Sequence, residues 1–436
     1  MKMTIDEALT QGGAGKFQRK LLGIFGLVWA ADAMQVIAVG FSAASIAASF
    51  GLTVPQALQT GTLFFLGMFI GATLFGRLAD RYGRRRVLIL TVACDAIFGL
   101  LSVFAPSFGV LLGLRFLTGV AVGGTLPVDY AMMAEFLPPR NRGRWLVWLE
   151  GFWAVGTIIV ALTAWLAASA GSTEAWRWIF AVAAVPALIG IWLRLWVPES
   201  PMFLLKSGDE PGARKVVAQV LQNNDAPPLP AEARLVLPQV TRTDGLFDGA
   251  MRGLTIAVLA LWFLVSLSYY GVFTWLPPRL ATDGFGFVRG YGFLVILALA
   301  QIPGYALAAH GVERWGRRPT LIGFLLLSAC ACLLFTLAPS PTVIAISLIL
   351  MSFALLGTWG ALYAFTPELY PTHLRGTGMG MASAFARLGG LCAPFILPAI
   401  VAQGFGLTIG LFAALLFLAA LVAVTIRVET RDRPIG

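Results

Sequence analysis

Histidine, cysteine and charged residues are scarce in this chain of 436 residues. It has two histidines, His310 and His373, and only 12% of its residues are charged. The sequence shows no metal-ligand spacing and no pairing of a nucleophile with a base, which argues against an enzyme and against a metal or other cofactor. A glycine-rich phosphate loop is also missing from the sequence, so nothing supports ATP-driven chemistry.

The cysteines are few and lie in apolar surroundings. All four fall inside apolar runs, which predicts buried, inert thiols: Cys94, Cys330, Cys332 and Cys392. The spacing Cys330-Ala-Cys332 is by itself only a weak signal for a metal site.

Apolar residues dominate instead. They make up 58% of the chain, and the mean hydropathy is +0.83. A soluble protein of this composition would expose far too much apolar surface, whereas runs of about 20 apolar residues suit membrane-spanning helices. We predict an all-α membrane protein with twelve transmembrane helices. The segments cover roughly 20–48, 60–80, 87–105, 108–135, 144–168, 176–196, 252–280, 290–312, 319–338, 342–369, 377–402 and 405–426.

The distribution of positive charge also fits a chain of membrane-spanning segments joined by loops. Lys and Arg number 31 against 21 Asp and Glu, and the basic residues gather in every second loop. The positive-inside rule then predicts a multi-pass protein of the inner (cytoplasmic) membrane with both termini in the cytoplasm. Because topology explains the charge, we expect no nucleic-acid partner, and we expect a monomer in the lipid bilayer.

Two motifs recur at one offset. DRYGRR at Asp80–Arg85 corresponds to ERWGRR at Glu313–Arg318, and EFLPPRNRG at Glu135–Gly143 corresponds to ELYPTHLRG at Glu368–Gly376. Both pairs are 233 residues apart. A repeat without gaps indicates a parallel duplication, with two six-helix halves related by an axis along the membrane normal.

The repeat also sets the domain boundaries. Residues 1–197 should form the first half and residues 251–436 the second. Between them, residues 198–250 are charged and rich in proline, which predicts a cytoplasmic linker with short helices. Pro211–Asn223 is the segment expected to form a helix there.

Several motifs resemble a known family. GRLADRYGRRR at 76–86 and PESP at 198–201 resemble the sugar-porter-like branch of the major facilitator superfamily. TIDEAL, TLPVDYAMMAEFLP, RGRWLVWLEGFWAVG and YYGVFTWLP resemble the niacin transporters and their synaptic-vesicle-protein-like relatives. The resemblance implies secondary active import, with alternating access, of a small aromatic monocarboxylate such as nicotinate by proton symport.

Charged residues inside the apolar runs are the candidates for proton coupling. An ionised carboxylate in a membrane helix costs at least about 2.5–3.5 kcal/mol, so Asp32 must pair, protonate or face water. In the proton-coupled sugar porters that this chain resembles, a first-helix Asp pairs with a fourth-helix Arg, which here is Arg115. Protonation of Asp32 would release Arg115; the alternative is a permanent structural ion pair. Asp129 is a second candidate proton carrier, and Glu150 is expected in a cytoplasmic charge network.

Arg387, in the middle of the eleventh helix, is the candidate anion receptor. Its planar guanidinium can hold a carboxylate with two hydrogen bonds, and similar organic-anion carriers place an arginine in this helix. Pairing with Asp32, Asp129 or a backbone carbonyl is the alternative. The other predicted binding residues could equally serve packing; they are Trp29, Tyr269, Tyr270, Phe273, Gln301, Trp359 and Tyr363, with Tyr130 and Trp153 as further aromatic candidates.

The repeated acidic and basic residues are the candidates for a cytoplasmic gate: Asp80, Arg84, Glu135, Arg142, Glu313, Arg317, Glu368 and Arg375. The resemblance places Asp80 at the start of the eleventh helix, where a negative charge meets the positive end of the helix dipole. By the repeat, Glu313 should face the start of the fifth helix near Gly143. Glu135 and Glu368 should pair with Arg142, with Arg375 or with arginines of the other repeat. Alternatively, these arginines only set the topology.

Other functions remain open at this point. A carrier of another organic anion or of an organic cation is compatible with the buried charges. A sugar carrier would need more amide side chains than Gln301. A receptor without transport activity would need a soluble domain, and the linker is too short to supply one.

Overall fold

The computed structural model of the chain describes residues 2–139, 142–230, 232–237, 245–282, 284–286, 288–401 and 404–430. Within these ranges the side chains of residues 80, 193, 194, 250, 372, 373, 375, 376, 394–399 and 401 are not described. The side chains of two predicted gating residues, Asp80 and Arg375, therefore lie outside the described part.

The first half consists of six long helices and one short one. They are α2 (Lys16–Phe50), α3 (Val54–Ala57), α4 (Gln59–Tyr82), α5 (Arg84–Val103), α6 (Phe108–Glu135), α7 (Arg142–Ser169) and α8 (Ala175–Arg194). Their bounds agree with the predicted apolar segments.

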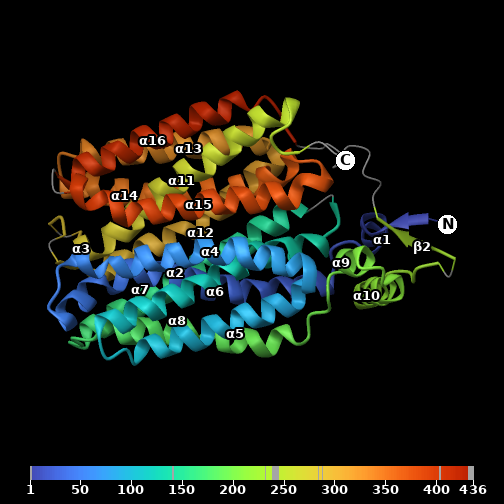
Figure 1. Cartoon of the computed structure of the whole chain (residues 1–436). Coiled ribbons are helices and arrows are strands. Elements are labelled where there is room, and N and C mark those ends of the chain that lie inside the picture. Colours follow the sequence, from blue (N-terminus) through green and yellow to red (C-terminus); the bar gives the residue numbers. More distant parts are fainter. Residues whose placement is uncertain are drawn as a thin grey trace.

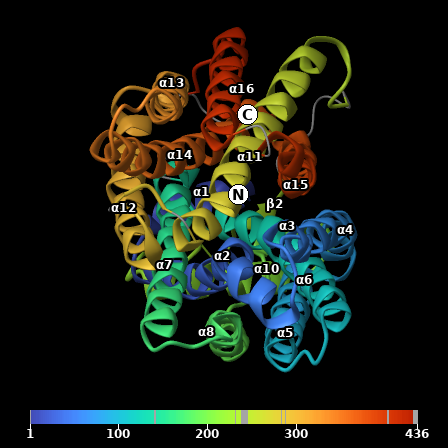
Figure 2. The same ribbon diagram turned by 90° about the vertical axis from the view of Figure 1, so that its left-hand side faces the viewer.

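The second half repeats the arrangement with α11 (Gly249–Thr282), α12 (Gly290–Arg314), α13 (Arg317–Thr336), α14 (Pro341–Leu369), α15 (Thr372–Val401) and α16 (Phe405–Thr425). Figure 1 shows the two halves side by side, and Figure 2 shows the bundle end-on, along the helices. In the described part of the chain, eleven helices are long and apolar enough to cross a membrane. With α15, of 30 residues, the twelve-helix prediction is confirmed.

Glycines set how closely the helices approach within each half. A Cβ on Gly71 of α4 would lie 2.0 Å from the carbonyl oxygen of Val120 in α6. A Cβ on Gly304 of α12 would lie 2.3 Å from the carbonyl oxygen of Phe353 in α14. Only glycine permits such backbone contact. Both members of one contact are 233 residues from those of the other, so the duplication extends to helix packing.

The prediction of buried cysteines holds in full for Cys332 alone, since Cys94 and Cys392 are half-buried. Cys332 is buried, but Cys330 is exposed on α13. Residues two apart on a helix point in nearly opposite directions, so an apolar run that faces both lipid and protein cannot bury both.

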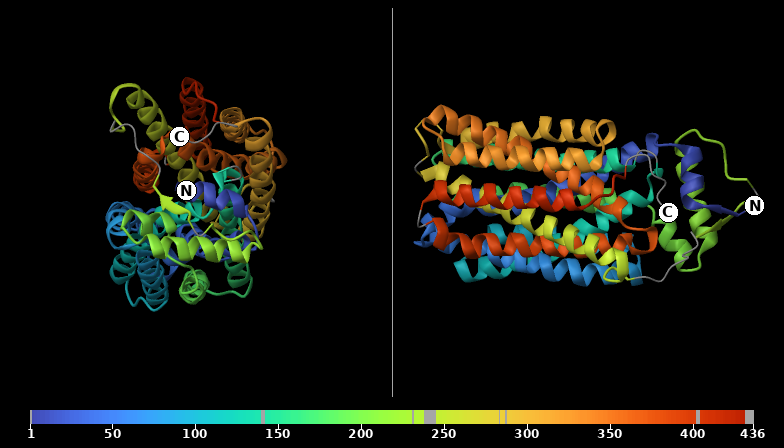
Figure 3. Two further views of the ribbon diagram at one scale, coloured as in Figure 1. Left: turned by 90° about the vertical axis from the view of Figure 1, so that its right-hand side faces the viewer. Right: turned by 90° about the horizontal axis from the view of Figure 1, so that it is seen from above.

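A small cap lies at one end of the bundle, at the right of Figure 1 and of the right-hand view in Figure 3. It contains β1 (Lys2–Thr4), α1 (Ile5–Gly12), α9 (Pro201–Lys206), α10 (Glu210–Asn223) and β2 (Arg234–Val236). Helix α10 confirms the short helix predicted in the linker. Strands β1 and β2 pair in parallel, so the N-terminal segment packs on the linker. Buried apolar side chains join them: Met3, Ala8, Ala213, Val217, Leu221, Leu229 and Leu235.

Asn224 ties this cap to the first membrane helix. Its Oδ1 accepts from the Phe17 N–H at 2.9 Å, and its Nδ2 donates to Gln18 Oε1 at 2.8 Å and to the Gly13 carbonyl at 3.2 Å. A single amide thus satisfies polar groups on both sides of the start of α2.

Candidate functional site

Equivalent aromatic residues from the two halves meet at the centre of the protein. The hydroxyl of Tyr130 in α6 donates to the carbonyl oxygen of Tyr363 in α14 at 3.0 Å, and these residues are 233 apart. Trp29 of α2 and Trp262 of α11 are also 233 apart, and their rings lie 6.1 and 4.7 Å from that of Tyr363. The repeat therefore brings its own copies together. The sequence prediction missed Trp262, which its offset from Trp29 would have revealed.

Helix α11 supplies the second part of this cluster. The Tyr269 ring lies 4.9 Å from Phe273, 5.1 Å from Tyr270 and 5.9 Å from Trp359. Trp153 of α7 donates from Nε1 to the Tyr269 hydroxyl at 2.8 Å. We call the following residues the central aromatic cluster: Trp29, Tyr130, Trp153, Trp262, Tyr269, Tyr270, Phe273, Trp359 and Tyr363.

Several polar atoms in this region have no hydrogen-bond partner among the described residues. They include Nε and Nη2 of Arg387, both amide atoms of Gln301, Oε1 of Glu150 and the indole nitrogens of Trp29 and Trp359. All five side chains are at least nine-tenths buried. An unsatisfied buried polar group costs about 1–3 kcal/mol, and more when it is charged. Such a concentration is typical of a site that binds a polar ligand.

Arg387 and Gln301 are placed beside the cluster by their helices. Gly390, one turn after Arg387 in α15, packs against the rings of Tyr270 and Phe65. The charge of Arg387 acts on Tyr270 and Tyr363. Gln301 precedes Tyr305 by four residues on α12, so both lie on the same face of that helix. The Tyr305 ring would lie 3.2 Å from a Cβ on Gly360, which follows Trp359 of the cluster.

Glu150 corrects a sequence prediction. It does not join a cytoplasmic charge network: it is 2% exposed, and its charge interacts with Arg387 and with the cluster tyrosines. The physical reason is depth. Helix α7 begins at Arg142, so Glu150 lies about 12 Å along the helix from its start.

The two halves touch at both ends of the cluster. Away from the cap, a Cβ on Gly40 of α2 would lie 2.8 Å from the carbonyl oxygen of Phe273, and the Tyr291 hydroxyl donates to the Phe41 carbonyl at 3.3 Å. At the cap end, a Cβ on Gly143 would lie 3.4 Å from Nη2 of Arg317. The cluster is therefore enclosed between two contacts that join the halves.

Arg115 is held differently from the way the sequence suggested. Its guanidinium donates to Gln35 Oε1 at 2.8 Å, to Ser102 Oγ at 2.7 Å and to Thr118 Oγ1 at 3.1 Å. Its hydrogen-bond partner from α2 among the described residues is thus Gln35, one turn after Asp32. The carboxylate whose charge acts on Arg115 is Asp95 of α5, which is 1% exposed.

Asp95 was missing from the predicted intramembrane carboxylates. Its position in CDAIFG, within a predicted span, was the signal that could have found it. The predicted proton carriers, Asp32 and Asp129, are 1% and 0% exposed, so all three aspartates are buried in the membrane region.

Two matching polar networks lie at the cap end, one in each half. In the first, Arg84 forms an ion pair with Glu135, Ser200 donates to the same carboxylate, and Glu199 accepts from the N–H of Arg85 at 3.1 Å. These contacts join the chain between α4 and α5 to the end of α6 and to the PESP segment.

The second network repeats these contacts. Arg317 donates to Glu368 from Nε at 3.0 Å and from Nη2 at 3.2 Å. Thr430 donates to Glu368 at 2.5 Å, and Glu429 accepts from the N–H of Arg318 at 3.1 Å. Glu429-Thr430 thus takes the place of Glu199-Ser200. The prediction missed this because that offset is 230 rather than 233.

These contacts correct the predicted partners of the gating acids. In the described structure Glu135 and Glu368 each pair with an arginine of their own half, Arg84 or Arg317. Arg142 instead donates to Asp6 of the N-terminal segment at 2.9 Å and to the Leu137 carbonyl at 2.9 Å. The charge pattern of the sequence could not identify which arginine pairs with which glutamate, because the loops at this end carry many arginines.

Glu313 lies where the repeat places it. Its Oε1 is 3.6 Å from Nη2 of Arg317, and it would be 4.0 Å from a Cβ on Gly143. Acids and arginine of the second half therefore surround the start of α7 in the first half.

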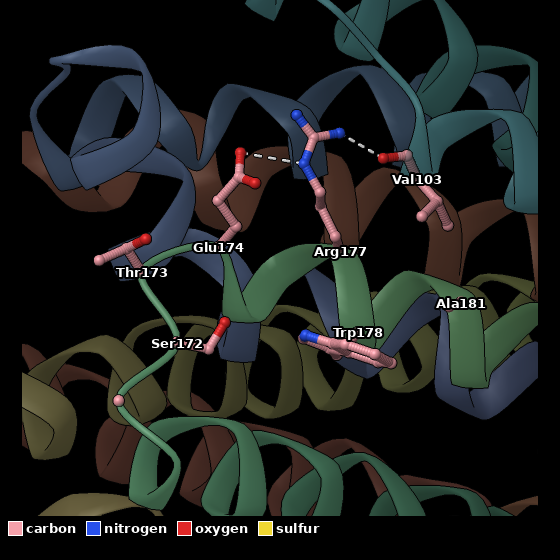
Figure 4. Close-up of a pocket in the computed structure, with 8 residues that line it drawn as sticks. Val103, Ser172, Thr173, Glu174, Arg177, Trp178 and Ala181 are labelled. Atoms are coloured by element: carbon pink, nitrogen blue, oxygen red, sulfur yellow. Dashed lines mark hydrogen bonds and ion pairs between the residues drawn. The ribbon is translucent and has the colours of Figure 1, made fainter.

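An open pocket far from this centre is a poor candidate for the site. Figure 4 shows it where residues 171–174 meet α8. Its arginine, Arg177, already pairs with Glu174 at 3.0 Å and donates to the Val103 carbonyl. An arginine satisfied in this way offers little to an anionic ligand.

Comparison with known proteins gives consistent matches. The family model described as "Sugar (and other) transporter" matches residues 18–435. The niacin transporter NiaP of Acinetobacter baylyi is 34% identical over 427 residues, which cover 96% of this chain and 96% of that protein. The synaptic vesicle 2-related protein of Pongo abelii is 31% identical over 458 residues, which cover 98% of this chain and 81% of that protein.

Solved structures agree on the fold. The proton:xylose symporter XylE, bound to 6-bromo-6-deoxy-D-glucose, has a TM-score of 0.77 at 19% identity, covering 96% of this chain and 97% of that one. The human organic anion transporter MFSD10 has a TM-score of 0.68 at 16% identity, covering 93% of this chain and 99% of that one. At these identities the likeness concerns the fold alone.

Proposed function

Because the chain belongs to the sugar (and other) transporter family of the major facilitator superfamily, we propose that it imports a small aromatic monocarboxylate, nicotinate above all, by proton symport with alternating access. Transport across a membrane follows from the family. The substrate, the proton and the direction are our proposal.

The observation that carries the proposal is the state of Arg387. It is 2% exposed beside an aromatic cluster, and its Nε and Nη2 have no hydrogen-bond partner among the described residues. A carboxylate can accept from both nitrogens at once, and a flat ring can stack in the cluster. The side chains assigned to the ring and its polar edge are Trp29, Tyr269, Tyr270, Phe273, Gln301, Trp359 and Tyr363.

Two devices would couple binding to movement. Asp32 and Asp129 are buried carboxylates that can take up a proton, and a change of charge at Asp32 can act on the network around Arg115. At the cap end, the Arg84–Glu135 and Arg317–Glu368 networks lie within each half, while Glu313 of the second half lies beside Gly143 of the first. We assign Asp80 and Arg375 to the same gate by the repeat. Opening would then break contacts between the halves and leave those within each half intact.

The relatives also support a location. We propose the inner membrane, with the cap and both termini in the cytoplasm and the protein acting as a monomer. Labelling of single cysteines introduced into the cap, in intact cells and in lysed cells, tests this orientation. Labelling in intact cells with a reagent that cannot cross the membrane would contradict it.

Uptake of labelled nicotinate into proteoliposomes tests the function. One proton and one monovalent anion carry no net charge, whereas each net charge moved would couple to voltage at about 2.3 kcal/mol per 100 mV. An imposed inward pH gradient should therefore drive accumulation, and an imposed voltage should have little effect. Benzoate, xylose and an organic cation serve as competitors. Inhibition by xylose but not by benzoate would contradict the proposed substrate class.

A further inference from the structure

Glu150 is the buried carboxylate that the proposed function leaves without a role. It comes from α7 in the first half, whereas Arg387 comes from α15 in the second half. Both side chains are 2% exposed and their charges interact. Yet Oε1 of Glu150 and the Nε and Nη2 atoms of Arg387 have no hydrogen-bond partner among the described residues. Glu150 lies one turn before Trp153 of the central aromatic cluster. Arg387 lies one turn before Gly390, which packs against Tyr270 of the same cluster, so both charges border that cluster.

The other groups that act on Glu150 are uncharged at neutral pH. They are the indole of Trp29 and, from the helices around α7, the phenols of Tyr130, Tyr269, Tyr270, Tyr305 and Tyr363. Model phenols lose their proton only near pH 10. Among the described residues, Arg387 is therefore the cation whose charge acts on Glu150. The buried carboxylate of Asp95 acts on the other buried arginine, Arg115, so the two arginines have separate acidic partners.

An anionic substrate changes the charge balance between Glu150 and Arg387. With Glu150 ionised, its charge already offsets that of Arg387, and a second carboxylate would leave a net negative charge in a poorly solvated site. Like charges close together at low dielectric repel strongly, so one of the two carboxylates must become neutral. With Glu150 protonated, Arg387 is left without a counter-ion and can receive the substrate carboxylate.

We infer that Glu150, rather than Asp32 or Asp129, carries the co-transported proton, and that its carboxylate and the substrate carboxylate alternate as the counter-ion of Arg387. The inference rests on the proposed function, since it requires an anionic substrate. A proton binds Glu150 on the side of uptake, and the substrate carboxylate then binds Arg387. After the substrate leaves on the other side, Glu150 releases its proton there, and its charge again offsets that of Arg387. One anion and one proton cross in each cycle.

Binding of nicotinate to the purified full-length protein tests this between about pH 6 and pH 8, where the nicotinate carboxylate stays ionised. For the wild type, the affinity should fall about tenfold per pH unit above the titration of Glu150. Glu150→Gln resembles the protonated acid in shape and charge. It should bind with an affinity that hardly changes with pH, and it should lose accumulation driven by a pH gradient. Asp95→Asn is the matched control, because it neutralises an equally buried carboxylate away from Arg387 and should keep the wild-type slope.

The outcomes distinguish a failure of the inference about Glu150 from a failure of the proposed function. If Glu150→Gln binds nicotinate with the wild-type pH slope, the inference is wrong while the proposed function stands. If the wild type binds no nicotinate at any pH, the proposed substrate is wrong and the inference fails with it. A third measurement does not depend on a variant: binding to the wild type in weak buffer should take up about one proton per nicotinate. Binding without proton uptake would overturn the inference even if Glu150→Gln failed to fold.

Discussion

Two buried arginines should respond to the same substitution in opposite ways. Arg115 is 0% exposed and donates to Gln35, Ser102 and Thr118, whereas Arg387 is 2% exposed and has two unpartnered nitrogens among the described residues. Methionine fills a similar volume without charge. Arg115→Met should therefore lower the free energy of unfolding, and Arg387→Met should chiefly weaken substrate binding.

The expected losses of stability and affinity follow from the hydrogen-bond partners of each arginine. Removing one member of a buried charged network costs about 3–5 kcal/mol, which is the expected loss of stability for Arg115→Met. Arg387→Met should cost less stability than Arg115→Met, since the Nε and Nη2 atoms of Arg387 have no hydrogen bond to lose among the described residues. Two charge-assisted hydrogen bonds to a carboxylate, at about 1.5 kcal/mol each, correspond to a loss of about 100-fold in nicotinate affinity.

Thermal unfolding in detergent, monitored by tryptophan fluorescence, gives the stability, and calorimetric titration of nicotinate gives the affinity. Because Arg387→Met also leaves Glu150 without its opposite charge, the double variant with Glu150→Gln controls for that effect. The reasoning would be refuted if Arg387→Met unfolded the protein while Arg115→Met left it stable. Unchanged nicotinate affinity in a folded Arg387→Met variant would refute the assignment of Arg387 as the anion receptor.

Two further predictions concern packing and the network of the second half. Gly71→Ala should destabilise the protein by several kcal/mol, because the new methyl would lie 2.0 Å from a backbone oxygen. Gly76 has open space around it, so Gly76→Ala should be nearly neutral in the same unfolding assay. Glu368→Gln should destabilise the second half by about 3 kcal/mol or more, because Arg317 loses its buried ionic partner. Glu313 lies 3.6 Å from Arg317 and its side chain is 36% exposed, so Glu313→Gln should cost much less stability. Equal losses of stability for the two glutamates would contradict the assignment of Glu368 as the main partner of Arg317.

The cap adds a contact that the repeat does not contain. The Asp6–Arg142 pair links the N-terminal segment to the start of α7, next to the point where Glu313 touches Gly143. Any separation of the halves at this end must therefore carry the cap with the first half, or break the pair.

The amino-acid sequence by itself determined the helices, their number and the duplication. Those features depend on properties that a linear pattern contains: the length of apolar runs, the turns at Gly83 and Gly316, and an offset of 233 residues. Both the Arg84–Glu135 and Arg317–Glu368 pairs belong to motifs found in this way. The expected pairing of Glu135 with Arg142 was wrong, because many arginines share the same end of the bundle. The side chain of Arg375, the other expected partner, lies outside the described residues.

The tertiary structure alone decided which buried polar groups face one another. Glu150 and Arg387 border the same aromatic cluster, Gln35 accepts from Arg115, and Arg142 donates to Asp6. In a soluble helix, the polar face reveals the rotation about the axis. A membrane helix is apolar on its lipid side and on much of its protein side, so its sequence leaves that rotation undetermined. The rotation was fixed by contacts between helices, such as those at Gly71 and Gly304, and it directed Arg387 and Glu150 into the protein interior.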